Sequence, residues 1–175
     1  MCDCAAGTFS SKSGSLTCSL CSSGQFSTQS TNTCILCIAG KYVQHSGASV
    51  CSSCSPGQFS PDNGAVMCTS CPKGTYMAKV QSRTCSNCGT GKYSTVTAAI
   101  SSSTCEMCSA GTFSQSLQGS ICVSCPQGSY SVTSGGTCAK CLSGKYSPVI
   151  GAASVLACIQ CPAGQNSRPG SSTCK

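Results

Sequence analysis

The sequence predicts an elongated solenoid of small disulfide-rich repeats, with short β-hairpins and little or no helix. Three observations predict it. Twenty-one of the 175 residues are Cys, most of these stand in C-x-x-C pairs, and all nine aromatic residues occupy one position of the resulting repeat. Cys content this high is typical of a cross-linked scaffold, and the few large apolar side chains cannot fill one core for a chain of this length.

The repeat is about 17 residues long and occurs ten times, so residues 1–175 are interpreted as a single tandem array. We number the repeats one to ten by the second Cys of each pair: Cys4, Cys21, Cys37, Cys54, Cys71, Cys88, Cys108, Cys125, Cys141 and Cys161. Three residues later there is always Gly, and two residues further there is Phe or Tyr, except that repeat ten has Asn166. A polar stretch of variable length then leads to the next pair, which marks that stretch as a surface loop.

Each repeat is expected to form a small hairpin or loop. The Gly-x-[Phe/Tyr]-Ser strip is the first expected strand, and the residues before the next Cys, such as Ser15-Leu16-Thr17, are the second. The motif Gly is expected to turn the backbone at positive φ or to allow close approach of the next disulfide. The ring is expected to lie over the disulfide of the neighbouring repeat.

The cysteines are assigned to disulfides, although sequence alone does not fix their connectivity. If each second Cys closes onto the first Cys of the next pair, ten bridges use twenty cysteines and leave Cys2 for a partner upstream. The expected pairs are Cys4–Cys18, Cys21–Cys34, Cys37–Cys51, Cys54–Cys68, Cys71–Cys85, Cys88–Cys105, Cys108–Cys122, Cys125–Cys138, Cys141–Cys158 and Cys161–Cys174. A bridge closing about fifteen residues removes roughly 3 kcal/mol of unfolded-state freedom.

Other chemistry is disfavoured by the residues present. Zinc is the main rival for C-x-x-C pairs, but these pairs are evenly spaced rather than grouped in fours. One His (His45) and three separated carboxylates provide no nucleophile–base set, so no catalytic residue, cofactor or metal ligand is assigned. The net charge of +7 comes from thinly spread Lys and Arg, which disfavours a nucleic-acid site. No apolar stretch approaches the ~18–20 residues of a membrane span.

The segments Cys-Ser-Pro-Gly-Gln-Phe-Ser (54–60) and Cys-Thr-Ser-Cys-Pro-Lys-Gly-Thr-Tyr (68–76) resemble the ephrin-receptor-like, or GCC2/GCC3-type, cysteine-rich repeat. They are also similar to the first module of tumour-necrosis-factor-receptor repeats. In that module the Cys before Gly bonds to the next Cys, in agreement with the pairing above. The resemblance implies an extracellular rod without enzymatic activity, of a kind found in large surface proteins of protists and algae.

From these observations we expect a structural rod segment of an extracellular glycoprotein that is filament-forming or on the cell surface, with neighbouring copies as partners in a filament or surface coat. The alternative is a receptor ectodomain whose loops bind a ligand. O-linked glycans are expected on Ser/Thr-rich loops such as 101–104 and 27–31. Ser55-Pro56, Ser60-Pro61 and Ser147-Pro148 resemble the Ser-Pro dipeptides that carry hydroxyproline glycans in algae and plants. Because the array begins and stops within a repeat, we also expect an excerpt of a longer protein.

Overall fold

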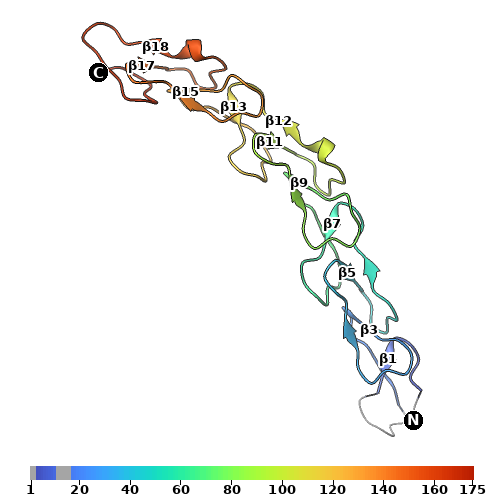
Figure 1. The fold of residues 1–175 in the computed structure, drawn as a ribbon. Helices are drawn as coiled ribbons and strands as arrows, with labels where there is room; N and C mark the ends of the chain where they lie inside the picture. Colours follow the sequence, from blue (N-terminus) through green and yellow to red (C-terminus); the bar gives the residue numbers. More distant parts are fainter. Residues whose placement is uncertain (1–2, 11–16) are drawn as a thin grey trace. The chain divides into compact units, whose positions relative to one another are not determined.

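Two-residue strands, paired as one hairpin in each of repeats one to nine, form every sheet in the part of the chain that the structure describes (Figure 1). The computed structural model describes residues 3–10 and 17–175. The first strands of the hairpins are β1 (Thr8–Phe9), β3 (Gln25–Phe26), β5 (Lys41–Tyr42), β7 (Gln58–Phe59), β9 (Thr75–Tyr76), β11 (Lys92–Tyr93), β13 (Thr112–Phe113), β15 (Ser129–Tyr130) and β17 (Lys145–Tyr146). The second strands are β2 (Ser19–Leu20), β4 (Ile35–Leu36), β6 (Ser52–Ser53), β8 (Thr69–Ser70), β10 (Ser86–Asn87), β12 (Glu106–Met107), β14 (Val123–Ser124), β16 (Ala139–Lys140) and β18 (Ile159–Gln160). The predicted class of small disulfide-rich repeats with short hairpins is confirmed.

The second strand of each hairpin lies between the two cysteines of a C-x-x-C pair. Phe9 pairs with Ser19 and Thr8 with Leu20, and the same register recurs along the chain. The prediction that this strand lies before the first Cys of the pair is therefore wrong. Ser15 and Leu16, two of the three residues given above as its example, lie outside the described residues. The physical reason is that the second Cys donates its N–H to the motif Gly carbonyl, as Cys21 does to Gly7 at 3.0 Å, which continues the ladder through the pair.

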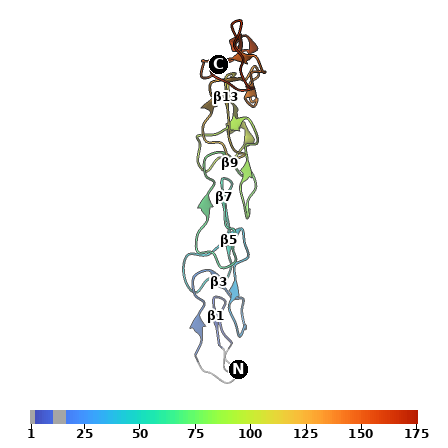
Figure 2. The same ribbon diagram turned by 90° about the vertical axis from the view of Figure 1, so that its left-hand side faces the viewer.

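The first compact unit contains residues up to Pro72 together with Tyr76–Ser86 and Thr97–Ser101. Within it, the hairpins begun by β1, β3, β5 and β7 follow one another in chain order in both views (Figures 1 and 2). The second unit contains Lys73–Thr75, Asn87–Val96 and Ser102–Lys175. Its hairpins begun by β11, β13, β15 and β17 also follow chain order (Figure 1).

Disulfide sulfur and small side chains take the place of a large apolar core. Eight of the ten second cysteines are at most 2 % exposed. In repeat three, Cys37, Cys51, Val43 and Ala48 form a buried cluster, and Phe26 of repeat two packs against it. Phe26 therefore packs against the cluster that contains the neighbouring disulfide, Cys37–Cys51, and it also forms a parallel backbone bridge with Ala48.

Two short 3₁₀ turns are the helical elements of the described residues. They are η1 (Ser102–Thr104) and η2 (Val155–Ala157), and each ends directly before the first Cys of a pair. Across residues 3–10 and 17–175, no helix has the length and apolar character needed to cross a bilayer.

Candidate functional site: the backbone contacts between repeats

The bonded cysteines join the second Cys of each pair to the first Cys of the next pair. Their Cα atoms lie 5.4–5.8 Å apart, within the range that disulfide geometry requires. The partners are Cys4–Cys18, Cys21–Cys34, Cys37–Cys51, Cys54–Cys68, Cys71–Cys85, Cys88–Cys105, Cys108–Cys122, Cys125–Cys138, Cys141–Cys158 and Cys161–Cys174. Each bridge closes one loop on itself, so no disulfide among these links distant repeats. The contacts between repeats must come from elsewhere.

In eight repeats, the motif glycine supplies the first contact to the next repeat. Its N–H donates to the carbonyl of the residue after the ring position in the following repeat, as Gly7 does to Ser27 at 2.9 Å and Gly111 to Ser131 at 2.8 Å. The N–H of the residue after the ring then donates to a loop carbonyl of the repeat that follows, as Ser27 does to Ala48 at 3.2 Å. These two bonds place successive hairpins in a fixed register.

A second contact reaches the preceding repeat and is made by one residue in each loop, which we call the turn residue. Its N–H donates to the carbonyl of the second Cys of the preceding repeat, at 2.6–2.9 Å. The turn residues with this bond are Ser30, Gly47, Gly64, Gln81, Ala98, Gly135, Gly151 and Gly170. All eight have positive φ, and they include Ser30, Gln81 and Ala98, the three non-Gly residues with positive φ in the described chain.

The carbonyl of the turn residue reaches one repeat further back. A Cβ built on Gly7 of repeat one would overlap the carbonyl oxygen of Gly47, which belongs to repeat three. The same relation joins Gly57 to Ala98 and Gly111 to Gly151. Eight motif glycines are closed off in this way, each by a loop carbonyl two repeats along the chain: Gly7, Gly24, Gly40, Gly57, Gly74, Gly91, Gly111 and Gly128.

The motif glycine is therefore required for two reasons, its conformation and its close contact. All ten have positive φ between 70° and 88°, a region that costs an L-residue roughly 1–2 kcal/mol. The predicted close approach is present at eight of the ten, but the neighbouring atom is a loop carbonyl two repeats away rather than the next disulfide. Because the colliding atom belongs to backbone, it cannot move aside as a flexible side chain would.

The backbone contacts that the motif glycines and turn residues make between repeats are called the backbone lattice below. The serine that follows the ring also takes part in these contacts, although its recurrence in the sequence did not predict that role. Ser27, Ser60, Ser94, Ser114, Ser131 and Ser147 are all buried. The Ser27 hydroxyl donates to the carbonyl of Thr8 in the preceding repeat at 2.9 Å. Burial of Ser60 and Ser147 also removes their hydroxyls from the set of exposed modification sites, whereas Ser55 and the three Pro residues of the Ser-Pro pairs are exposed.

Charged groups are sparse around this lattice. The Tyr93 hydroxyl donates to Glu106 Oε2 at 2.8 Å, and this hydrogen bond, with the carboxylate charge, raises the pKa of Tyr93 above its usual value. His45 is exposed and its Nδ1 lies 3.2 Å from the carbonyl oxygen of Ser46. The described residues contain no group of three or more His, Cys, Asp or Glu arranged to hold a metal ion.

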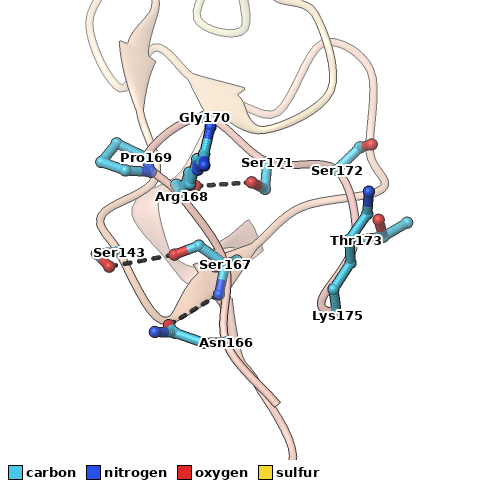
Figure 3. A pocket seen from close by; sticks show the side chains of 10 residues that line it. All are labelled: Ser143, Asn166, Ser167, Arg168, Pro169, Gly170, Ser171, Ser172, Thr173 and Lys175. Carbon is cyan, nitrogen blue, oxygen red and sulfur yellow. Dashed lines mark hydrogen bonds between the residues drawn. The ribbon is translucent and has the colours of Figure 1, made fainter.

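An open hollow of ≈ 800 Å³ lies at repeat ten, lined mainly by polar side chains (Figure 3). Ser143 donates from its hydroxyl to the carbonyl of Ser167 at 3.1 Å. Asn166 Oδ1 accepts the N–H of Ser167 at 2.8 Å. Asn166 stands at the position where the other nine repeats have an aromatic ring.

One family model matches this chain. It is described as tyrosine-protein kinase ephrin type A/B receptor-like, and it matches residues 24–67 and 57–105. The matched stretch includes the segments on which the resemblance was based, so that resemblance is confirmed. No curated protein sequence matches the chain. Together with the disulfides, the family indicates an extracellular or cell-surface location, since such bridges persist in oxidising compartments.

Proposed function

The chain carries ephrin-receptor-like cysteine-rich repeats, and from this premise we propose that it is a stiff structural segment of an extracellular, filament-forming or cell-surface glycoprotein. The observation that supports this role is the backbone lattice. Seven turn residues (Gly47, Gly64, Gln81, Ala98, Gly135, Gly151 and Gly170) each bind the second-Cys carbonyl of the preceding repeat and place their own carbonyl against the motif glycine of the repeat before that. Bending between two repeats would open both contacts, so the lattice favours a segment that transmits force or sets a distance.

The proposed role is non-enzymatic and uses no bound cofactor. The disulfides close loops of 13 to 17 residues, each contributing roughly 3 kcal/mol against the unfolded state. All nine aromatic residues are half-buried, and Phe26 packs against the buried cluster of the following repeat. Both features serve stability along the chain, as expected when each unit is stabilised mainly by its neighbours.

The test compares the oxidised chain with the same chain after reduction and alkylation, using small-angle X-ray scattering and proteolysis. We expect the oxidised chain to scatter as a stiff particle of constant cross-section and to resist protease. We expect the reduced chain to scatter as a flexible coil and to be digested quickly. A shape and protease resistance unchanged by reduction would refute the proposal.

A receptor-type ectodomain is the second candidate, favoured by one exposed apolar turn. In η2 of repeat nine, Val155 is 48 % exposed and Leu156 is 86 % exposed. A ligand-binding role requires such a local feature, because the remaining repeats are alike. Saturable binding of a soluble protein that is lost in Leu156→Ser would support this candidate.

O-linked glycans on the exposed hydroxyls of the loops belong to the same proposal. The Ser/Thr side chains on the outer loops, such as Ser55, are accessible, whereas the buried Ser60 and Ser147 hydroxyls are not. Intact mass and glycopeptide mapping of the native protein test this expectation. A mass equal to that of the bare oxidised polypeptide would refute it.

A further inference from the structure

The sequence contains one Asn-Gly dipeptide, Asn63-Gly64, in the loop of repeat four. Asparagine deamidates most readily when glycine follows it, because glycine has no Cβ to hinder attack of its backbone nitrogen on the asparagine side chain. Gly64 is also the turn residue of this repeat, with its N–H bonded to repeat three. The dipeptide most susceptible to this reaction therefore forms part of the backbone lattice.

Three contacts hold the dipeptide against repeats two and three. The Gly64 N–H donates to the carbonyl of Cys37 at 2.6 Å. The Gly64 carbonyl oxygen lies against Gly24, where it would be 2.2 Å from a Cβ. Asn63 Oδ1 accepts the N–H of Ala39 at 2.8 Å. Asn63 itself is exposed, so water can reach the dipeptide and its reacting groups are restrained by contacts rather than by burial.

We propose that Asn63 is a deamidation site that the backbone lattice keeps closed, and that it reacts only when the loop of repeat four separates from repeats two and three. In this reaction the Gly64 nitrogen attacks Asn63 Cγ, and the Cγ–Nδ2 bond breaks. The proton of the Gly64 nitrogen passes through water to the leaving nitrogen, which departs as ammonia and leaves a succinimide. Water then opens the succinimide at either carbonyl, giving aspartate or isoaspartate; water is the only other reactant, and no atom is oxidised or reduced.

The Gly64 nitrogen is the group that the lattice blocks. Its proton is shared with the Cys37 carbonyl, and the nitrogen must lose this proton before it can attack. The Ala39 N–H alone would not prevent the reaction, since a donor on Asn63 Oδ1 stabilises the negative charge that develops there during attack. Opening of the turn contact is therefore the step that controls the rate.

The two products differ in their effect on the lattice. Aspartate at position 63 keeps the length of the main chain and keeps an oxygen for the Ala39 N–H. Isoaspartate adds a methylene to the main chain before Gly64, so the contacts of Gly64 with Cys37 and Gly24 cannot both be restored. Conversion to isoaspartate thus makes a transient opening of this contact permanent.

The experiment follows conversion at residue 63 by peptide mapping and mass spectrometry during incubation at neutral pH. The oxidised 175-residue chain is compared with a synthetic peptide of residues 58–67, in which the dipeptide is unconstrained. Each of the two hydrogen bonds should favour the closed loop about fivefold, so the folded chain should react at least about twentyfold more slowly than the peptide.

Gly24→Ala is the variant that opens the site, and Gly111→Ala is its matched control. A Cβ at residue 24 would lie 2.2 Å from the Gly64 carbonyl oxygen, and one at residue 111 would lie 2.2 Å from that of Gly151. The two substitutions impose the same clash, but only the first acts on the loop that contains Asn63. We expect Gly24→Ala to speed deamidation of Asn63 about tenfold and Gly111→Ala to leave it within about twofold of the parent. Unfolding curves check that both variants fold.

A measurement on the parent alone covers the case in which Gly24→Ala does not fold. Urea concentrations below the unfolding transition should raise the deamidation rate of Asn63 and the hydrogen-exchange rate of the Gly64 amide by the same factor, because both need the same opening. Equal rates in the folded chain and the peptide, equal effects of the two substitutions, or deamidation that does not follow Gly64 exchange would each overturn the inference. None of these outcomes bears on the proposed function, which depends on the stiffness of the oxidised chain.

Discussion

Repeats six and nine carry the two longest loops, with bonded cysteines 17 positions apart in the sequence instead of 13 or 14. Their turn residues nevertheless make the same contacts: Ala98 bonds Cys71 at 2.8 Å and Gly151 bonds Cys125 at 2.7 Å. The extra residues follow the turn residue and end in a 3₁₀ turn. In repeat six that turn is Ser-Ser-Thr (η1), and in repeat nine it is Val-Leu-Ala (η2).

Each of these loops therefore has two parts with different roles: the turn residue, and the residues between it and the first Cys. The turn residue stands five residues after the ring in both repeats, and it is held by backbone contacts on both sides. The residues between it and the first Cys vary in length and polarity without changing that contact. The length and polarity of this outer part of the loop can therefore change while the backbone contacts between repeats are preserved.

The largest effects are expected where a turn carbonyl meets a motif glycine. Gly57→Ala would collide with the carbonyl of Ala98, and Gly111→Ala with that of Gly151. Each should lower the free energy of unfolding by about 3 kcal/mol or more, since strain at positive φ adds to backbone overlap. Denaturant unfolding under oxidising conditions measures it.

Gly89→Ala is the control for these substitutions, because Gly89 is not a motif glycine, has φ 92° and has nothing within 4 Å of its Cβ position. It should lower the free energy of unfolding by only about 1–2 kcal/mol, the effect of positive φ alone. Equal losses for Gly57→Ala and Gly89→Ala would show that the glycine contact two repeats away contributes nothing.

A smaller, reciprocal effect is expected at the two turn residues themselves. Ala98 holds φ 52° and Gly151 holds φ 72°, so one chain contains both the strained and the relaxed version. Ala98→Gly should raise the free energy of unfolding by about 1 kcal/mol, and Gly151→Ala should lower it by about the same amount. Thermal unfolding of both variants tests this; a change of the same sign in both would contradict it.

The sequence predicts most of the hairpin but little of the contact between a motif glycine and the turn residue two repeats along the chain. The fixed spacing of Cys, Gly and ring predicts the first strand, the positive φ of the glycine and the position of Phe26, because one side chain or its absence determines each. The lattice contact is made by backbone atoms, so it leaves no side-chain signature except the glycine. Its other half, the turn residue, is Gly in some repeats and Ser30, Gln81 or Ala98 in others.

One signal for the turn residue was present all the same. Gly47, Gly64, Gly135 and Gly151 each stand five residues after a ring, and a recurring Gly in a variable loop indicates a required positive φ. The second strand was harder to predict, because the two residues inside a C-x-x-C pair range from Ile-Leu to Ser-Ser and are exposed. Neither β-propensity nor an alternating pattern identifies such a strand.

Substitutions in the exposed 3₁₀ turns should change the polarity of the surface without weakening the backbone contacts between repeats. Leu156→Ser in repeat nine and Ser102→Val in repeat six exchange the character of η2 and η1. We expect the free energy of unfolding to change by less than about 0.5 kcal/mol in each, while retention on a hydrophobic-interaction column falls for the first and rises for the second. A loss of stability in Leu156→Ser comparable with that of Gly111→Ala would place η2 within the lattice.

The smallest effect distinguishes the hairpins of the same two repeats. Tyr93 of repeat six pairs with Glu106, whereas Tyr146 of repeat nine pairs with Ile159. The Tyr93 hydroxyl donates to Glu106, and a phenolate there would lose that bond and face the carboxylate, so the pKa of Tyr93 lies above 10.0. A raised pKa in the folded state stabilises the protein while Tyr93 is protonated, and this stabilisation is lost as the pH rises through that pKa. Ultraviolet difference titration should show Tyr93 ionising at lower pH in Glu106→Gln than in the parent; an unchanged titration would mean that the hydrogen bond does not persist in solution.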